Sequence, residues 1–199
     1  MADITAKMVS ELRGRTGAGM MDCKKALEEA AGDFDKAAEL LRMKGAARAD
    51  KRAGRAVAEG VIEAYVHFNA RVAVLVELNC ETDFVARNEE FRALAKDLAL
   101  HVASARPLAV RVEDVPADVI AAERRVYEAQ VAEEKKQDAV KAKIVEGRLR
   151  KFYEESVLLE QKFVKDDTKT VGDLVKAMSA KTGENVQVRR FARFELGGS

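Results

Sequence analysis

The chain contains few side chains suited to catalysis, and their spacing does not bring them together. His67 lies in an expected strand, on the face opposite its apolar residues, and His101 lies late in an expected helix. No serine or cysteine sits in the Gly-x-Ser-x-Gly type of turn that exposes a nucleophile. Adjacent carboxylates such as Glu89 and Glu90 point about 100° apart on a helix and do not share a site. We therefore predict no catalytic residue and no enzymatic activity.

Metal and cofactor chemistry is equally scarce. Cys23 and Cys80 are far apart and form no Cys-x-x-Cys pair, so we expect buried thiols rather than a disulfide framework or zinc ligands. The TGAG sequence at residues 16–19 lacks the preceding strand and the Lys-Ser/Thr pair of a phosphate-binding loop. A tight turn between two helices is the simpler interpretation. We predict no metal and no cofactor.

The composition is that of a soluble protein rich in helix. Hydrophobic residues make up 48% of the 199 residues, charged residues make up 35%, and tryptophan is absent. No apolar run approaches the ~18 residues that span a bilayer, and the start of the chain lacks a signal-peptide pattern. We expect a cytoplasmic protein without a membrane partner, or the same module imported into an organelle.

The charge balance argues against a dedicated nucleic-acid binder. Phosphate contacts normally leave a clear basic excess, whereas the formal net charge is +1. Locally, the segment from Arg42 to Arg55 carries six basic residues against one acid, Asp50. A solvated segment after a helix is the favoured interpretation, and it predicts no direct nucleic-acid requirement. A docking patch for RNA or the ribosome is the alternative.

Three short helices are expected in residues 1–46, because apolar residues recur at helical spacing between glycine-containing breaks. Gly45 is a plausible end for the third helix. Residues 47–58, rich in alanine, lysine and arginine, are then the predicted linker. A bundle this small buries little surface alone, so we expect part of it to face a partner.

Residues 59–199 are predicted to form an α+β core. Two apolar alternations around a turn at residues 69–70 indicate a β-hairpin. A following helix is expected to cover the hairpin, and a final strand at residues 186–195 extends it into a small antiparallel sheet with helices on one face. The alternating residues are Ile62, Ala64, Val66 and Phe68 in the first strand and Val72, Val74, Val76 and Leu78 in the second.

Within this core, residues from about 116 to 155 are predicted to form two antiparallel helices. The segment is dominated by good helix formers, with apolar residues at helical spacing and a break near residues 136–138. We interpret the pair as a projecting arm.

Two short segments carry side chains that a small fold does not easily bury. Met20 and Met21 begin a helix of a bundle that has room for one of them. Residues 82–85 place the bulky Phe84 between a polar loop and a helix, where Asp83 is a suitable N-cap. Core packing and exposure to a protein partner remain open for both segments.

The same two segments resemble the signatures of the elongation factor Ts family. The first is LRGRTGAGMMDCKKAL, from Leu12 to Leu27, and the second is LNCETDFVARN, from Leu78 to Asn88. The closing VKDDTKTVGDL and RFARFEL segments also fit, so the matches cover nearly the whole chain in order. The resemblance implies an N-terminal three-helix module like a ubiquitin-associated (UBA) domain, a core with a small antiparallel sheet, and a projecting helical arm.

By this resemblance, the protein promotes GDP release from elongation factor Tu and binds its GDP-bound and nucleotide-free forms. The segment Thr82, Asp83, Phe84 and Val85 matches the element that displaces Mg²⁺ from Tu, with Asp83 and Phe84 at its tip. The N-terminal module is implied to contact the GTPase domain of Tu. The contact candidates in the matching motif are Leu12, Arg13, Met20, Met21 and Lys24.

One departure from longer family members concerns the core, which is duplicated in them and present once here. The chain therefore resembles the short form of the family. A homodimer would supply the missing half, and the final strand would expose an edge if it lies outermost.

Overall fold

The computed structural model describes residues 4–134 and 136–197. It is an α+β protein with a three-stranded and a two-stranded sheet. The predicted domains and arm include a few residues outside this description. These are residues 1–3 and 198–199 at the ends of the predicted domains and residue 135 in the predicted arm. The chain divides into two compact units. The first comprises Met1–Val61, Leu78–Arg92 and Asp173–Gln187, and the second comprises Ile62–Glu77, Ala93–Gly172 and Val188–Ser199.

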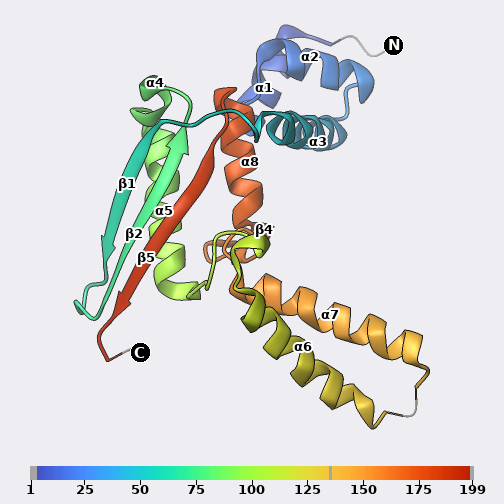
Figure 1. Ribbon diagram of the computed structural model, residues 1–199. Helices are drawn as coiled ribbons and strands as arrows, with labels where there is room; N and C mark the ends of the chain where they lie inside the picture. The colour runs from blue at the N-terminus through green and yellow to red at the C-terminus, as the bar shows by residue number, and fades with distance from the viewer. Residues whose placement is uncertain (1–3, 135, 198–199) are drawn as a thin grey trace. The chain divides into compact units, whose positions relative to one another are not determined.

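The first unit begins with a three-helix bundle (Figure 1), formed by α1 (Ala6–Thr16), α2 (Met20–Glu29) and α3 (Phe34–Arg52). The side chains of Thr5 and Asp33 cap α1 and α3 by accepting backbone N–H groups of the first turn. The three predicted helices are therefore present. Their common core is small and consists of Val9, Leu12, Cys23, Ala26, Leu27, Ala30 and Ala37.

The predicted end of the third helix at Gly45 is wrong, because α3 continues to Arg52. The residues after Gly45 are good helix formers, and they outweigh the cost of about 1 kcal/mol for one internal glycine. Gly45 also permits close packing, since a Cβ added there would lie 3.1 Å from the Cβ of Ala180. Arg52 then donates to the carbonyl of Ser179 at 3.3 Å. The predicted linker is thus helical over its first six residues, 47–52.

Strands β1 (Glu59–Val66), β2 (Val72–Cys80) and β5 (Gln187–Glu195) form the larger sheet in the order β1-β2-β5. The N–H of His67 donates to the carbonyl of Val72 at 2.9 Å and closes the predicted hairpin. Leu196 N–H donates to the carbonyl of Arg71 at 2.8 Å. The hairpin and the final strand were both predicted from the sequence, and the small antiparallel sheet confirms them.

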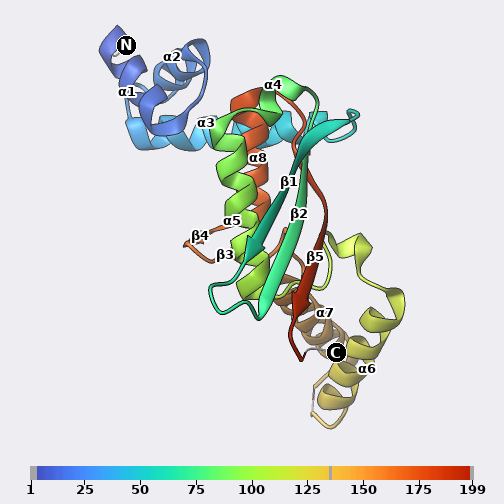
Figure 2. The same ribbon diagram turned by 90° about the vertical axis from the view of Figure 1, so that its left-hand side faces the viewer.

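The helix α5 (Glu89–Ala105) lies along one face of this sheet (Figures 1 and 2). Arg193 of β5 reaches across to the carbonyl of Ala103, with its Nε and Nη2 both at 3.3 Å. Buried apolar residues of the second unit include Val74 and Val76 on β2 and Leu94, Leu98 and Val102 on α5. The predicted cover of the hairpin is therefore present.

The apolar residues of β1 lie on the other face, contrary to the expectation that the following helix covers them. Ile62 is 68% exposed, Val66 is 64% exposed and Phe68 is 92% exposed. Pairing of His67 with Val72 places Tyr65 opposite the buried Val74, so the odd-numbered residues of β1 share the covered face. Side chains alternate along a strand, which leaves the even-numbered residues in solvent.

Two helices, α6 (Ala117–Ala132) and α7 (Asp138–Ser156), form a helical hairpin in the second unit. Its core consists of Val131, Val145 and Leu149, with Tyr127 and Ile144 beside them. The short helices α4 (Asp83–Ala86) and η1 (Val112–Asp114), the helix α8 (Val171–Thr182), and the strands β3 (Lys162–Phe163) and β4 (Asp166–Thr170) complete the fold. The two-stranded sheet was not predicted.

His101 joins α5 to the segment around β3. The N–H of Val164 donates to its Nδ1 at 3.3 Å, so Nε2 carries the proton and donates to the Oε1 of Gln161 at 3.0 Å. Burial lowers the pKa of His101 below its ordinary value, and the Gln161 hydrogen bond opposes this in part. His101 is therefore a neutral structural residue.

We expect the free energy of unfolding to fall as the pH drops below about 6.5, the pKa of an unperturbed histidine. The unfolded chain then binds a proton at His101 that the folded chain does not bind. Urea unfolding followed by circular dichroism between pH 7.5 and 5.5 measures this loss. The loss should be smaller in His101→Gln than in wild type. Equal pH dependence in wild type and His101→Gln would contradict the assignment.

Candidate protein-binding site

The first signature segment lies on the N-terminal bundle, where α2 starts at Met20. Met20 is 44% exposed and Met21 is 65% exposed, so both methionines are available at the surface. Arg13 is exposed as well, and the exposed Lys24 pairs with Glu28 at 3.8 Å. The bundle thus presents four of the five predicted contact residues.

Leu12 requires a correction, because it is completely buried. It packs in the bundle core between α1 and α2, where an apolar side chain at helical spacing is expected to lie. A direct contact with a partner is not open to it. Its role is to support the surface that carries the methionines.

The second signature segment follows β2 directly and forms the single-turn helix α4. Phe84 is 81% exposed at this turn, whereas Val85 and Ala86 are buried. Val85 was predicted as part of the element that displaces Mg²⁺ from Tu. Because its side chain is buried, it instead anchors the α4 turn to the rest of the protein. An exposed phenyl ring on a turn fixed by buried neighbours is a rigid apolar tip.

The N-cap of α4 is Thr82 rather than the predicted Asp83. Thr82 has an extended backbone, with φ −127° and ψ 155°, and its Oγ1 accepts the N–H of Val85 at 3.4 Å. Asp83 is instead the first helical residue. Its carboxylate pairs with Arg87 one turn later, with an Oδ2 to Nη2 distance of 2.8 Å. Asp83 is therefore exposed but already engaged by a cation.

The loop that leads into α4 is held by two residues that the sequence reasoning missed. Glu184 accepts hydrogen bonds from Glu81 and Thr82, and the N–H of Asn185 donates to the Oε1 of Glu81 at 2.6 Å. Both follow Gly183, which ends α8 with φ +77°. The helix stop at Gly183 was the one local feature near Glu184 and Asn185. Nothing in the sequence links this turn to the loop at Glu81 and Thr82, about 100 residues earlier.

Cys80 lies at the base of the same loop and is completely buried. Its Sγ donates to the carbonyl of Thr82 at 3.2 Å. Burial raises the pKa of the Cys80 thiol to about 11, and the Glu184 carboxylate adds to this effect. The thiol therefore stays protonated at neutral pH and acts as a structural group, as predicted for a buried cysteine.

The basic segment from Arg42 to Arg55 has half of its cations paired with carboxylates of the first unit. Arg48 forms a two-pronged ion pair with Asp22, at 2.8 and 3.0 Å, which lowers the pKa of that carboxyl. Three of its six cations pair with carboxylates and a fourth donates to a backbone carbonyl, a pattern that favours an internal structural role over a phosphate-binding patch. They are Lys44 with Glu29, Arg48 with Asp22, Arg52 with the Ser179 carbonyl, and Arg55 with Glu81.

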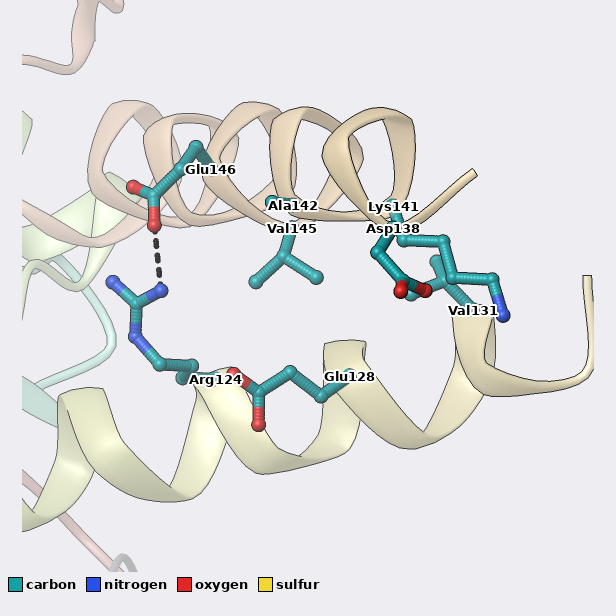
Figure 3. Close-up of a pocket in the computed structure, with 8 residues that line it drawn as sticks. All are labelled: Arg124, Glu128, Val131, Asp138, Lys141, Ala142, Val145 and Glu146. Carbon is teal, nitrogen blue, oxygen red and sulfur yellow. Dashed lines mark hydrogen bonds and ion pairs between the residues drawn. The ribbon is translucent and has the colours of Figure 1, made fainter. Parts of the chain in front are cut away.

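A hollow of about 310 Å³ opens between α6 and α7 (Figure 3). Arg124 reaches across it to Glu146 at 2.5 Å, and Val145 points into it beside Asp138 and Lys141. Its charges of both signs are typical of a thinly packed helical hairpin.

Over residues 4–134 and 136–197, no cluster of three or more metal-binding side chains occurs. In the same part of the chain, no helix has the length and hydropathy needed to cross a membrane.

The protein is thus a mixed α+β protein. Its first unit exposes Met20 and Met21 of the first signature segment and Phe84 of the second. The sequence profile of the family described as "Elongation factor TS" matches residues 47–198. The chain belongs to this family of translation elongation factors. It is 57% identical to elongation factor Ts of Desulforamulus reducens over 197 residues, which are 99% of this chain and 91% of that protein.

Two further relatives show the same relationship. Elongation factor Ts of Thermotoga maritima is 56% identical over 195 residues, covering 98% of this chain and 97% of the relative. Elongation factor Ts of Carboxydothermus hydrogenoformans is 58% identical over 194 residues, covering 98% and 89%. The resemblance inferred from the two signature segments is therefore confirmed.

Proposed function

We propose that the chain is the guanine nucleotide exchange factor of elongation factor Tu and that Phe84 acts as its wedge. The observation that carries the proposal is the exposure of this phenyl ring on α4, directly after β2, in a protein of the elongation factor Ts family. The residues that enter the partner are Phe84 and Asp83, and Thr82 and Val85 hold them in place.

The mechanism follows from thermodynamic linkage. A protein that binds nucleotide-free Tu more tightly than GDP-bound Tu weakens GDP binding by the same factor. Burial of one phenyl ring is worth roughly 1.5–3 kcal/mol, which is about a ten- to hundredfold effect. Displacement of Mg²⁺ from the partner's phosphates adds to it, because the ion is the largest positive charge near them. No bond is made or broken, so the protein is not an enzyme.

The N-terminal bundle is proposed to dock on the GTPase domain of Tu. Met20 and Met21 supply an adaptable apolar surface, and Arg13 and Lys24 supply charge around it. We assign this role to a UBA-like module formed by α1, α2 and α3, which ends at Arg52 rather than at the predicted residue 46. A core of residues 59–199 follows, and it carries a projecting arm at about 116–155. A cytoplasmic location, without a membrane partner or a direct nucleic-acid requirement, fits this function.

The alternative function, binding to RNA or the ribosome, depends on the basic segment. Its ion pairs with Glu29, Asp22 and Glu81 argue against it, because cations already engaged by carboxylates are poorly available to phosphates. RNA binding by this segment would fall steeply with salt, whereas apolar contacts to Tu would persist.

The experiment that tests the exchange function is a comparison of affinities. The dissociation constant of the protein should be measured by titration for nucleotide-free Tu and for Tu bound to GDP and Mg²⁺. The first complex should be tighter by about ten- to a hundredfold or more, in line with the wedge. Equal affinities for both forms would rule out exchange by this mechanism.

We also propose that the short form pairs as a homodimer through the open face of the sheet. Its apolar residues from β1, β2 and β5 and the following turn are Ile62, Val66, Leu75, Phe194 and Leu196, all exposed. Glu77 and Arg190 form an ion pair at 2.7 Å on this face, so charges of both signs are present for a two-fold related copy. A stable interface needs roughly 800 Å² from each partner, which a sheet face of this kind can supply.

We expect Phe194→Asp to shift the protein from dimer to monomer at micromolar concentration, because a buried carboxylate without a partner is strongly unfavourable. Sedimentation velocity measures the mass. Leu108→Asp places the same charge at another exposed apolar residue and should leave the dimer intact. A wild-type protein that sediments as a monomer would count against the homodimer.

A further inference from the structure

We propose that Glu184 is a positioning residue, which fixes Phe84 in its exposed orientation before the protein meets its partner. The inference rests on the proposed exchange function and adds a residue that touches neither nucleotide nor metal. Glu184 lies outside both signature segments, in the turn between α8 and β5.

The Glu184 carboxylate binds the loop in front of α4 through three hydrogen bonds. Its Oε2 accepts the backbone N–H groups of Glu81, at 3.0 Å, and Thr82, at 3.1 Å. Its Oε1 accepts the hydroxyl of Thr82 at 2.6 Å. Both oxygens are thus used on two consecutive residues. Hydrogen bonds to an ionised acceptor are about twice as strong as neutral ones, so this is a firm attachment.

Thr82 transmits the constraint to the turn that carries Phe84. A hydroxyl group has a single hydrogen, which Thr82 donates to Glu184 while its oxygen accepts the N–H of Val85. The N–H of Ala86 also donates to the Thr82 carbonyl at 3.2 Å. Thr82 is therefore held on one side of Phe84, and buried Val85 lies on the other. The backbone of Phe84 has little freedom between them.

The neighbouring Asn185 extends the same attachment to the chain that leaves α3. Its Nδ2 donates to the carbonyls of Ala53, at 3.3 Å, and Arg55, at 2.8 Å, and the side chain is nearly completely buried. Arg55 in turn pairs with Glu81 at 3.4 Å. One turn therefore holds both the loop before α4 and the segment that follows the N-terminal bundle.

The functional consequence is preorganisation of the wedge. A loop that is already ordered in the free protein loses less conformational entropy on binding, so more of the contact energy remains for opening the nucleotide site. Without the carboxylate, three donors lose their acceptor and the loop must be ordered during binding. Contacts made by the N-terminal bundle do not depend on this attachment. Loss of the carboxylate should therefore lower the maximal rate of GDP release more than it weakens the initial binding to Tu.

The test is the maximal rate of release of a fluorescent GDP analogue from purified Tu. Glu184→Ala should lower this rate by about tenfold, in line with the loss of charge-assisted hydrogen bonds. Glu160→Ala removes an exposed glutamate elsewhere and should behave as wild type. Glu184→Gln should recover much of the loss, because its amide oxygen accepts both N–H groups and its NH₂ donates to the Thr82 oxygen.

A double-mutant cycle separates positioning from a general structural effect. In a Phe84→Ala background, Glu184→Ala should change the rate by less than about twofold, because the effect passes through the ring. The same fractional loss in both backgrounds, or a wild-type rate in Glu184→Ala, would overturn the proposal. If the wild type and Glu160→Ala also fail to accelerate release, the exchange function itself is wrong.

A second pair of variants keeps the test decisive if circular dichroism shows that Glu184→Ala does not fold. Thr82→Val keeps the shape of the side chain but removes the hydroxyl that links Glu184 to α4, whereas Thr82→Ser keeps it. Thr82→Val should be about fivefold slower than Thr82→Ser, from the loss of the same hydrogen bonds. Equal rates for the two variants would overturn the proposal.

Discussion

Replacement of Phe84 by alanine is expected to slow the stimulated release of GDP from elongation factor Tu by about ten- to hundredfold at saturating protein concentration. The phenyl ring is 81% exposed in the free protein, so its removal costs little folding stability, and the loss belongs to the complex. Stopped-flow fluorescence with a GDP analogue measures the rate, and thermal unfolding shows whether stability is unchanged.

Leu108→Ala is the matched control, because it removes another exposed apolar side chain, outside both signature segments. Its exchange rate should stay within about twofold of wild type, as is usual for exposed positions without special contacts. If Phe84→Ala stimulates release as well as wild type does, the wedge lies elsewhere, and Met20 and Met21 become the first residues to test.

Gly60→Ala is expected to destabilise the fold by about 3 kcal/mol or more, from steric overlap and backbone strain together. Gly60 has φ +151°, and a Cβ there would lie 2.2 Å from the carbonyl oxygen of Leu78 and 2.8 Å from the Cα of Asn79. These contacts are with backbone atoms, which cannot turn aside as a side chain can. Urea unfolding at constant pH measures the change.

The effect of Gly60→Ala reaches the site because Leu78 and Asn79 lie just before the loop that enters α4. The side chain of Asn79 also donates to the carbonyl of Glu59 at 3.2 Å, which ties the two strands together here. Gly147→Ala is the control: Gly147 lies within α7 with open space around it, and alanine there should stabilise by up to about 1 kcal/mol. A Gly60→Ala protein as stable as wild type would show that the strands separate at little cost.

The sequence predicted the sheet but placed one strand face wrongly. Alternation in residues 62–68 correctly indicated a strand, and it also suggested that its apolar residues face the core. Alternation identifies two faces without saying which is covered, and the register set by the pair His67 and Val72 decides it. The apolar face of β1 is therefore in solvent, where we propose that a second copy covers it.

The candidate site was predictable only where its residues are close together in sequence. The motifs around Met20 and Phe84 are local, and both side chains are exposed, which settles the choice between core packing and exposure that the sequence left open. Burial of Leu12 was indicated by its helical spacing, but the motif match assigned it a contact. Glu184 and Asn185 act across about 100 residues, and no local pattern carries that pairing.

Helix propensity explains the remaining difference at α3. A single glycine in an alanine-rich segment is a weak stop signal, and tertiary packing of Gly45 against Ala180 removes even that. Arg48 and Arg52, which looked like part of a solvated linker, are thereby placed on a helix and contact Asp22 and the carbonyl of Ser179. These side chains of the candidate phosphate-binding segment, Arg42 to Arg55, are thus used in ion pairs and hydrogen bonds within the protein.

The decisive measurement is the release of a fluorescent GDP analogue from purified elongation factor Tu, in Mg²⁺ and at several salt concentrations, with and without the wild-type protein. Exchange by a wedge predicts that release accelerates with protein concentration, reaches a plateau, and persists as the salt concentration rises. A folded wild-type protein that leaves the rate of release unchanged at every salt concentration would contradict the exchange function and favour the RNA-binding alternative.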